Sequence, residues 1–170
     1  MRVEQIRQRL QALGARPCHE QRVLRSWTQL RSLDTRHRLA ENFLPLALRN
    51  ALPEIMSDLA GLANIRSQHA GEDASLRLLV GLGDGQTVES VLLPRDGLCV
   101  STQVGCAVGC VFCMTGRDGL LRQLGSAEIV AQVVLARAIR PVKKVVFMGM
   151  GEPAHNLDNV LEAIELLGIE

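Results

Sequence analysis

The chain has 170 residues, of which 47% are hydrophobic, and a formal net charge of +1 at pH 7. This length fits one domain, or one small domain with part of a second, and the apolar content is enough for a buried core. No apolar run is long enough to span a membrane and no signal-peptide pattern opens the chain, so we expect a cytoplasmic protein without a membrane partner. In that compartment five cysteines indicate metal binding or catalysis rather than disulfides.

The charge is distributed unevenly. Residues 1–50 carry ten arginines against four acidic residues, a net charge of +6, whereas the rest of the chain carries −5. Such a basic segment is typical of proteins that bind a polyanion such as RNA, although a solvated arginine-rich helical surface would have the same composition. One Trp, three Phe and no Tyr are too few to indicate a platform for base stacking.

Helical periodicity marks the start of the chain. Apolar side chains recur every three or four residues over 2–13 and 19–32, and Gly14 separates the two segments. At this spacing Trp27 is expected to be a core residue. Cys18, distant from the other cysteines, is expected to be a small buried side chain.

Prolines and then an alternating pattern mark the middle of the chain. Residues 35–60 predict two or three short helices punctuated by Pro45 and Pro53. Beyond them, alternation and glycine-containing turns indicate an antiparallel meander of three strands, Ile65–Ala70, Ser75–Gly81 and Thr87–Leu93. Within the third strand, Glu89 fits the solvent-facing half of the alternation.

The pattern becomes α/β after a turn at residues 94–97. We therefore predict an α+β lobe of helices and a small meander over residues 1–94, and an α/β unit over residues 95–170. Its expected elements, in order, are the strand Leu98–Gln103, a cysteine-rich loop, a helix capped by Ser126, the strand Val145–Met148, a loop with Gly149–Pro153, and a helix from Asn156 or Asp158. Such a right-handed parallel unit places both loops on one side, and the second strand would have an apolar edge.

Three cysteines in a C-x₃-C-x₂-C spacing follow the first of these strands: Cys106, Cys110 and Cys113. Thiolates are soft ligands, and short spacings let one loop wrap a single metal centre. A closed structural zinc site needs four donors, whereas a four-iron cluster held by three cysteines keeps one iron open to a ligand. The spacing therefore favours chemistry over scaffolding.

The run from Cys99 to Cys113, with Phe112 before the last cysteine, and the run from Met148 to Pro153 closely resemble the radical S-adenosylmethionine (radical SAM) enzymes. Among these enzymes they are most similar to the RNA adenine-C2 methyltransferases of ribosomal and transfer RNA. The resemblance implies that residues 95–170 are the first units of a partial, truncated radical SAM (βα) barrel. About two of six strand–helix units are present, and the methyl-carrying cysteine near the family's C-terminus is absent. We therefore expect the chain to be inactive alone.

The resemblance also implies cofactors. Cys106, Cys110 and Cys113 would ligate a [4Fe-4S] cluster whose open iron chelates S-adenosyl-L-methionine. Gly151 and Glu152 would bind the amino-acid end of that cofactor, where a carboxylate can accept charge-assisted hydrogen bonds from the ammonium. An electron donor such as a flavodoxin or ferredoxin would reduce the cluster, and cleavage of the cofactor would give a 5′-deoxyadenosyl radical.

Two residues outside the cysteine loop match further positions of the family. Its members methylate C2 of an adenine in 23S rRNA or tRNA through a methyl-cysteine intermediate. Cys99 matches the cysteine that resolves the protein–RNA crosslink by forming a disulfide, and Glu89 matches the acid described as the proton acceptor. From composition alone, Cys99 would instead be a buried strand thiol.

Three functions stay open at this stage. The first is the N-terminal part of an RNA adenine-C2 methyltransferase, active with a second chain or a continuation that supplies the missing half of the barrel. The second is a non-catalytic iron–sulfur or RNA-binding remnant. The third is a structural zinc module in which His155 supplies the fourth ligand.

Overall fold

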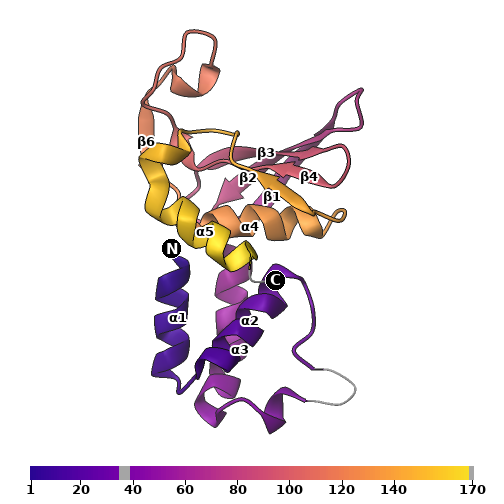
Figure 1. Cartoon of the computed structure of the whole chain (residues 1–170), viewed down its shortest axis with the longest axis vertical. Helices are drawn as coiled ribbons and strands as arrows, with labels where there is room; N and C mark the ends of the chain where they lie inside the picture. The colour runs from indigo at the N-terminus through magenta and orange to yellow at the C-terminus, as the bar shows by residue number, and fades with distance from the viewer. Residues whose placement is uncertain (35–38, 169–170) are drawn as a thin grey trace.

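The structure is a computed structural model that describes residues 1–34 and 39–168. It has a mixed α+β fold. Figure 1 shows helices α1, α2 and α3 at one end of the molecule and the main sheet near the other, with helices α4 and α5 between them. No helix in the described ranges is both long and apolar enough to cross a membrane.

The helical end follows the apolar periods of the sequence. Its elements are α1 (Val3–Ala12), α2 (Pro17–Thr28), the 3₁₀ turn η1 (Ala40–Asn42) and α3 (Leu46–Gly61). Trp27 is 4% exposed, which confirms its expected place in the core. Pro45 caps the start of α3, in agreement with the predicted helix boundary there. Residues 35–38, which belong to the predicted 35–60 region, lie outside the described residues.

Two expectations for the helical end are wrong. Helix α3 runs through Pro53 instead of stopping there. It buries Leu48 on one side of the proline and Ile55 beyond it. Burying such side chains contributes about 2 kcal/mol each, which offsets the ~3 kcal/mol cost of an interior proline. Cys18 is exposed rather than buried, because helical geometry places it half a turn around α2 from Trp27.

A five-stranded sheet forms the other layer. Its strands are β1 (Ala63–Ala70), β2 (Leu76–Leu82), β3 (Thr87–Leu93), β4 (Gly97–Cys99) and β7 (Lys144–Val146), paired in the order β1-β2-β3-β4-β7. The first four are antiparallel neighbours, which confirms the meander, and β4 pairs with β7 in parallel, as expected for the α/β unit. Because β3 pairs with β4, the sheet continues past residue 94, and the division into residues 1–94 and 95–170 stays a prediction.

The predicted strand Leu98–Gln103 is two strands. Strand β4 ends at Cys99, and β5 (Gln103–Gly105) pairs with β6 (Leu120–Gln123) in a separate two-stranded sheet. Between them, the backbone of Val100 and Thr102 bonds to the segment after β7. Strand β7 is also shorter than predicted. It is the terminal strand of the sheet and is followed by the 81% exposed Met148, in agreement with the expected apolar edge. Over the described residues, β4 and β7 are not part of a closed barrel.

Helix α4 (Ser126–Arg137) lies between the sheet, α2 and α5 (Leu157–Gly168), and most of its residues are buried. Ser126 is its first residue, whereas the cap is Gly125, whose N–H donates to the Glu128 carboxylate at 2.8 Å. Ser126 was the expected cap. Its hydroxyl instead accepts from the Val3 N–H at 2.7 Å and donates to Glu162, so it links α1, α4 and α5.

Candidate functional site

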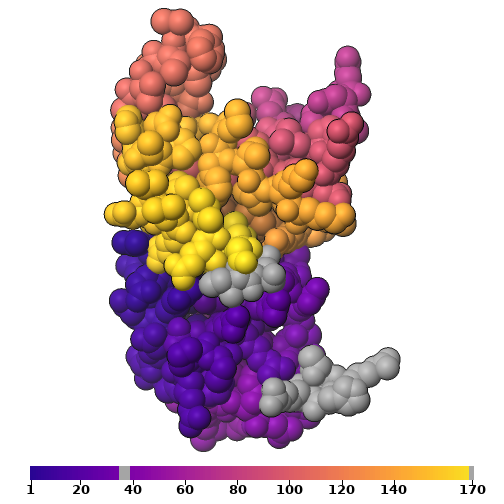
Figure 2. Space-filling model, in the orientation of Figure 1, coloured from indigo at the N-terminus to yellow at the C-terminus, as the bar shows by residue number. Residues whose placement is uncertain are grey.

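The cysteine loop, residues 106–119, connects β5 to β6 and includes the 3₁₀ turn η2 (Met114–Gly116). It stands out from the body of the molecule as a protrusion (Figure 2). At its base the Cys106 N–H donates to the Gly119 carbonyl at 3.0 Å. A side chain at Gly105, which has φ +76°, would meet that carbonyl, because a Cβ there would lie 2.1 Å from the oxygen. The close approach of the two ends of the loop therefore requires glycine at this position.

Two of the three thiols share one turn. The Cys113 N–H donates to the Cys110 carbonyl at 3.0 Å, and both side chains are exposed. Both line a hollow of about 260 Å³, which is completed by Gly109, Val111, Met114, Gly116 and Arg117. The third thiol, Cys106, is half-buried at the base of the loop.

The electrostatics of Cys113 suit a metal ligand. The Thr115 hydroxyl, together with the backbone N–H groups of Thr115 and Gly116, lowers the pKa of the Cys113 thiol. The thiolate is the form that binds metal, so this donor set fits a soft metal centre. In the described residues, however, no three His, Cys, Asp or Glu side chains are gathered as a metal site would need. The structure therefore does not bring the cysteine triplet together as ligands, nor a set that includes the exposed His155.

A second loop, after β7, lies against the segment between β4 and β5. The Gly149 N–H donates to the Val100 carbonyl at 3.0 Å, and the Thr102 N–H donates to the Met150 carbonyl at 2.8 Å. The cysteine loop continues from β5, so both loops leave the same side of the α/β unit, which confirms the prediction from the strand order.

Gly151 and Glu152 lie at the end of this second loop. Gly151 has φ +98°, and a Cβ there would lie 2.5 Å from the Cβ of Gln103, so only glycine fits. The half-buried Glu152 caps the 3₁₀ turn η3 (Pro153–Asn156), and its carboxylate accepts the Ala154 N–H at 3.1 Å. The backbone of Gly151 thus packs directly against Gln103, with the Glu152 carboxylate on the next residue.

Glu89 and Cys99 lie on one face of the sheet. Val91 is paired with Cys99, and side chains alternate along β3, so Glu89 shares the face of Val91 and Cys99. Ser90 points to the other face, where its hydroxyl donates to Gln132 of α4 at 2.8 Å. The two family-matched residues are therefore diagonal neighbours on the side of the sheet away from α4.

Their environments differ. The Glu89 side chain is 43% exposed and pairs with Arg77 at 3.3 Å. Cys99 is half-buried, and this burial raises the pKa of its thiol, opposed by a hydrogen bond with the Met148 backbone. All five cysteines of the chain are free thiols.

This region also contains a set of buried side-chain amides that was not predicted from the sequence. Gln103 and Gln132 are 0% exposed, and Asn156 is 5% exposed. Asn156 donates to the carbonyls of Thr102 and Leu124, both at 2.8 Å. No sequence signal separates these amides from ordinary exposed ones, because each has at least one partner in the backbone of an irregular segment.

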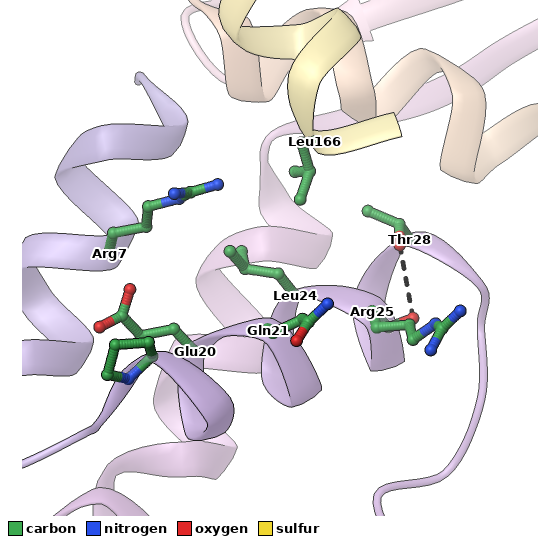
Figure 3. A pocket seen from close by; sticks show the side chains of 8 residues that line it. Arg7, Glu20, Gln21, Leu24, Arg25, Thr28 and Leu166 are labelled. Atoms are coloured by element: carbon green, nitrogen blue, oxygen red, sulfur yellow. Dashed lines mark hydrogen bonds between the residues drawn. The ribbon is translucent and has the colours of Figure 1, made fainter. Parts of the chain in front are cut away.

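A further pocket lies in the helical end, away from the cysteine loop (Figure 3). It has a volume of about 200 Å³ and lies between α1, α2 and the end of α5, where Arg7, Glu20 and Leu166 line it. Nearby arginines form internal ion pairs, such as Arg9 with Asp58 and Glu54. The net charge of +6 over residues 1–50 is thus partly neutralised by acids from elsewhere in the fold.

Comparisons with known proteins bear on this arrangement. Residues 100–170 match the family model of the radical SAM superfamily. The chain is 77% identical over 168 residues to a protein of Azoarcus sp. named a probable RNA methyltransferase, which covers 99% of this chain and 48% of that protein. A protein of Thiobacillus denitrificans with the same name is 73% identical over 170 residues, 100% of this chain and 47% of that protein.

A solved structure is also similar. The crystal structure of a radical SAM methyltransferase from Sphaerobacter thermophilus matches with a TM-score of 0.70 and 34% identity, over 98% of this chain and 50% of that one. The chain thus spans about half the length of the curated relatives it matches. By its radical SAM domain and by these relatives, the chain belongs to the radical SAM methyltransferase family.

Proposed function

We propose that this chain is part of an RNA methyltransferase that modifies C2 of adenine in 23S rRNA and tRNA through a methyl-cysteine intermediate. The observation that carries the proposal is that two loops follow strands at one side of the α/β unit, and that the second loop is hydrogen-bonded to the segment that leads into the first. One contains Cys106, Cys110 and Cys113, and the other contains Gly151 and Glu152. Relatives named probable RNA methyltransferases support the choice of RNA as substrate.

The three cysteines would hold a [4Fe-4S] cluster, and the lowered pKa of Cys113 favours the thiolate that such a ligand needs. When bound, the cluster supplies the electron that cleaves S-adenosylmethionine to a radical. By the resemblance, Gly151 and Glu152 would bind the amino-acid end of that cofactor, and the Glu152 carboxylate would accept hydrogen bonds from its ammonium. The exposed loop would also be accessible to a flavodoxin or ferredoxin.

On the sheet face away from α4, Cys99 would resolve the crosslink between the protein and RNA by forming a disulfide with the methyl-carrying cysteine. Glu89, on the same face, would accept the proton that leaves C2 of the adenine. Its exposure and its exposed partner Arg77 leave its carboxylate accessible to a substrate. Residues 1–94 would act as the RNA-binding lobe and residues 95–170 as the radical SAM core, in a cytoplasmic protein whose remaining barrel units come from a continuation or a second chain.

Anaerobic reconstitution with iron and sulfide tests the ligand assignment. We expect about four iron atoms per chain, with the visible absorption of an iron–sulfur cluster. Cys110→Ala should lose most of the iron, whereas Cys18→Ala, which removes an exposed thiol on α2, should keep it. Tetrahedral zinc–sulfur coordination without iron, or unchanged iron content in Cys110→Ala, would contradict the proposal.

The adenine-C2 assignment needs a second experiment. The reconstituted chain is given S-adenosylmethionine, a reductant and ribosomal or transfer RNA, and nucleosides are analysed by mass spectrometry. We expect background methylation by the chain alone and 2-methyladenosine when it is fused to the unmatched half of the Azoarcus relative. A methylated nucleoside other than 2-methyladenosine would overturn the substrate position but not the cluster assignment.

A further inference from the structure

The hairpin that carries the cysteine loop also contacts the turn that contains Glu152. Gln103 on β5 and Gln123 on β6 are paired across this hairpin, and Gln103 Nε2 donates to Gln123 Oε1 at 2.9 Å. The other end of each amide reaches the turn. Gln103 Oε1 accepts the Glu152 N–H at 2.7 Å, and Gln123 Nε2 donates to the His155 carbonyl at 2.9 Å. Two side-chain amides thus connect to Glu152 and His155, the two ends of the turn that the His155 N–H closes by donating to the Glu152 carbonyl at 3.1 Å.

The hydrogen bonds form a single directed series. Each amide donates through its nitrogen and accepts through its oxygen, so neither side chain can be inverted without breaking two bonds at once. Gln103 is fully buried, where an unpaired amide would be costly, and its stem lies against Gly151. The position of Gly151 and the N–H of Glu152 therefore both depend on this one side chain.

We propose that Gln103 and Gln123 form an amide clamp that positions Gly151 and Glu152 relative to the cysteine loop. The inference rests on the proposed function, because it takes these two residues as the site for the amino-acid end of S-adenosylmethionine. The clamp is at the base of the β5–β6 hairpin and the cysteines are on the loop that joins its strands, so one rigid element fixes both. Gln103 and Gln123 act as positioning residues and do not contact the cofactor themselves.

Substitutions at Gln103 distinguish the hydrogen bonds of its amide from the packing of its stem against Gly151. Gln103→Met keeps the apolar stem against Gly151 but removes both hydrogen bonds. Gln103→Glu keeps an oxygen for the Glu152 N–H but replaces the donor to Gln123 Oε1 with a second acceptor. Asn156→Leu is the matched structural control, because it removes three hydrogen bonds, to the carbonyls of Thr102 and Leu124 and from Asn159, without touching Gly151 or Glu152.

Amide hydrogen exchange of Glu152 in the metal-free chain is the first measurement. We expect exchange roughly 5- to 10-fold faster in Gln103→Met, because the N–H loses its acceptor, and near wild type in Gln103→Glu and Asn156→Leu. Equal exchange in wild type and Gln103→Met would overturn the clamp, whatever the chain binds.

S-adenosylmethionine binding to the reconstituted chain, followed by the electron paramagnetic resonance of the reduced cluster, is the second measurement. Gln103→Met should bind on the order of 10-fold more weakly, with unchanged iron content, as expected when a residue that supports a ligand is lost. Gln103→Glu should recover most of the affinity. Equal affinity in wild type and Gln103→Met would overturn the positioning role, whereas a wild-type chain that holds no cluster would overturn the proposed function and this role with it.

Discussion

Gln132 allows a quantitative test of how the site is supported. It projects from α4 and is fully buried. Its Oε1 accepts from the Ser101 N–H at 2.9 Å and from the Ser90 hydroxyl at 2.8 Å, and its Nε2 donates to the Ser101 carbonyl at 2.9 Å. Ser101 in turn donates its hydroxyl to the Glu89 carbonyl and accepts the Met150 N–H. One side chain of α4 therefore supports the segment between β4 and β5.

Gln132→Leu keeps the volume of the side chain but can neither donate nor accept. Both backbone groups of Ser101 and the Ser90 hydroxyl then lose their Gln132 partner inside the core. Each such group costs about 1–3 kcal/mol, so we expect a loss of about 3–9 kcal/mol in the free energy of unfolding. For a chain of this length, a loss of about 4 kcal/mol lowers Tm by roughly 8–16 °C.

The measurement is thermal and urea unfolding followed by circular dichroism. Gln11→Leu is the matched control, because Gln11 is exposed on α1 and its substitution should change stability by no more than about 0.5 kcal/mol. A change below about 1 kcal/mol in Gln132→Leu would refute the reasoning, since it would mean that the Ser101 backbone finds other partners at little cost.

Two further predictions concern pH. Burial alone would raise the pKa of Glu162, but hydrogen bonds from the Ser126 hydroxyl, the Glu4 N–H and Arg2 hold it below its ordinary value. Its stabilising contribution is therefore present above about pH 4.5 and is lost as pH falls through the lowered pKa, so the stability difference between wild type and Glu162→Gln should shrink towards pH 3. The lowered pKa of Cys113 depends first on the Thr115 hydroxyl, so Thr115→Val should raise it and slow alkylation of this thiol at pH 7.

Different measurements test the Glu162 and Cys113 predictions. Unfolding curves of wild type and Glu162→Gln from pH 3 to 7 measure the first, and a stability difference that stays constant over this range would contradict the assignment. Peptide-resolved iodoacetamide labelling of the metal-free chain measures the second. Cys18 on α2 provides the internal control, because its labelling rate should not respond to Thr115→Val. Identical pH profiles for Cys113 in the two proteins would exclude the hydroxyl as the cause.

Periodicity predicted most elements of this fold. Helices α1 and α2 and the three meander strands lie within a few residues of their predicted ranges, because each buries one face with a regular repeat. At Pro53 the expectation that a proline ends a helix is wrong, because α3 buries side chains on both sides of the proline and this packing stabilises a continuous helix. Cys18 lies outside the predicted segment 19–32, whereas α2 begins at Pro17 and so places Cys18 on the helix opposite Trp27.

The candidate site was predictable in part for a different reason. Cysteine spacing and the Gly151–Glu152 pair identify two loops, and the strand order predicts that both leave one side of the unit. The buried amides were not predictable. Gln and Asn are mostly exposed, and only the irregular backbone around Ser101 and Thr102 creates the unpaired groups that they satisfy. The split of the strand Leu98–Gln103 creates that need, and it is not visible as a pattern.

This irregularity has a physical consequence for how the site is held. A regular strand over residues 98–103 would pair through its backbone alone. Shifting its pairing register by one residue would keep the backbone hydrogen bonds and would exchange which side chains face each side of the sheet. Here the backbone groups of Ser101 and Thr102 are bonded by side chains from α4 and η3, each of which fits one position only. Because a buried amide that loses its partner is costly, a shifted register would break several bonds together. The segment between the two loops therefore has one strongly preferred alignment, which a site built from two separate loops requires.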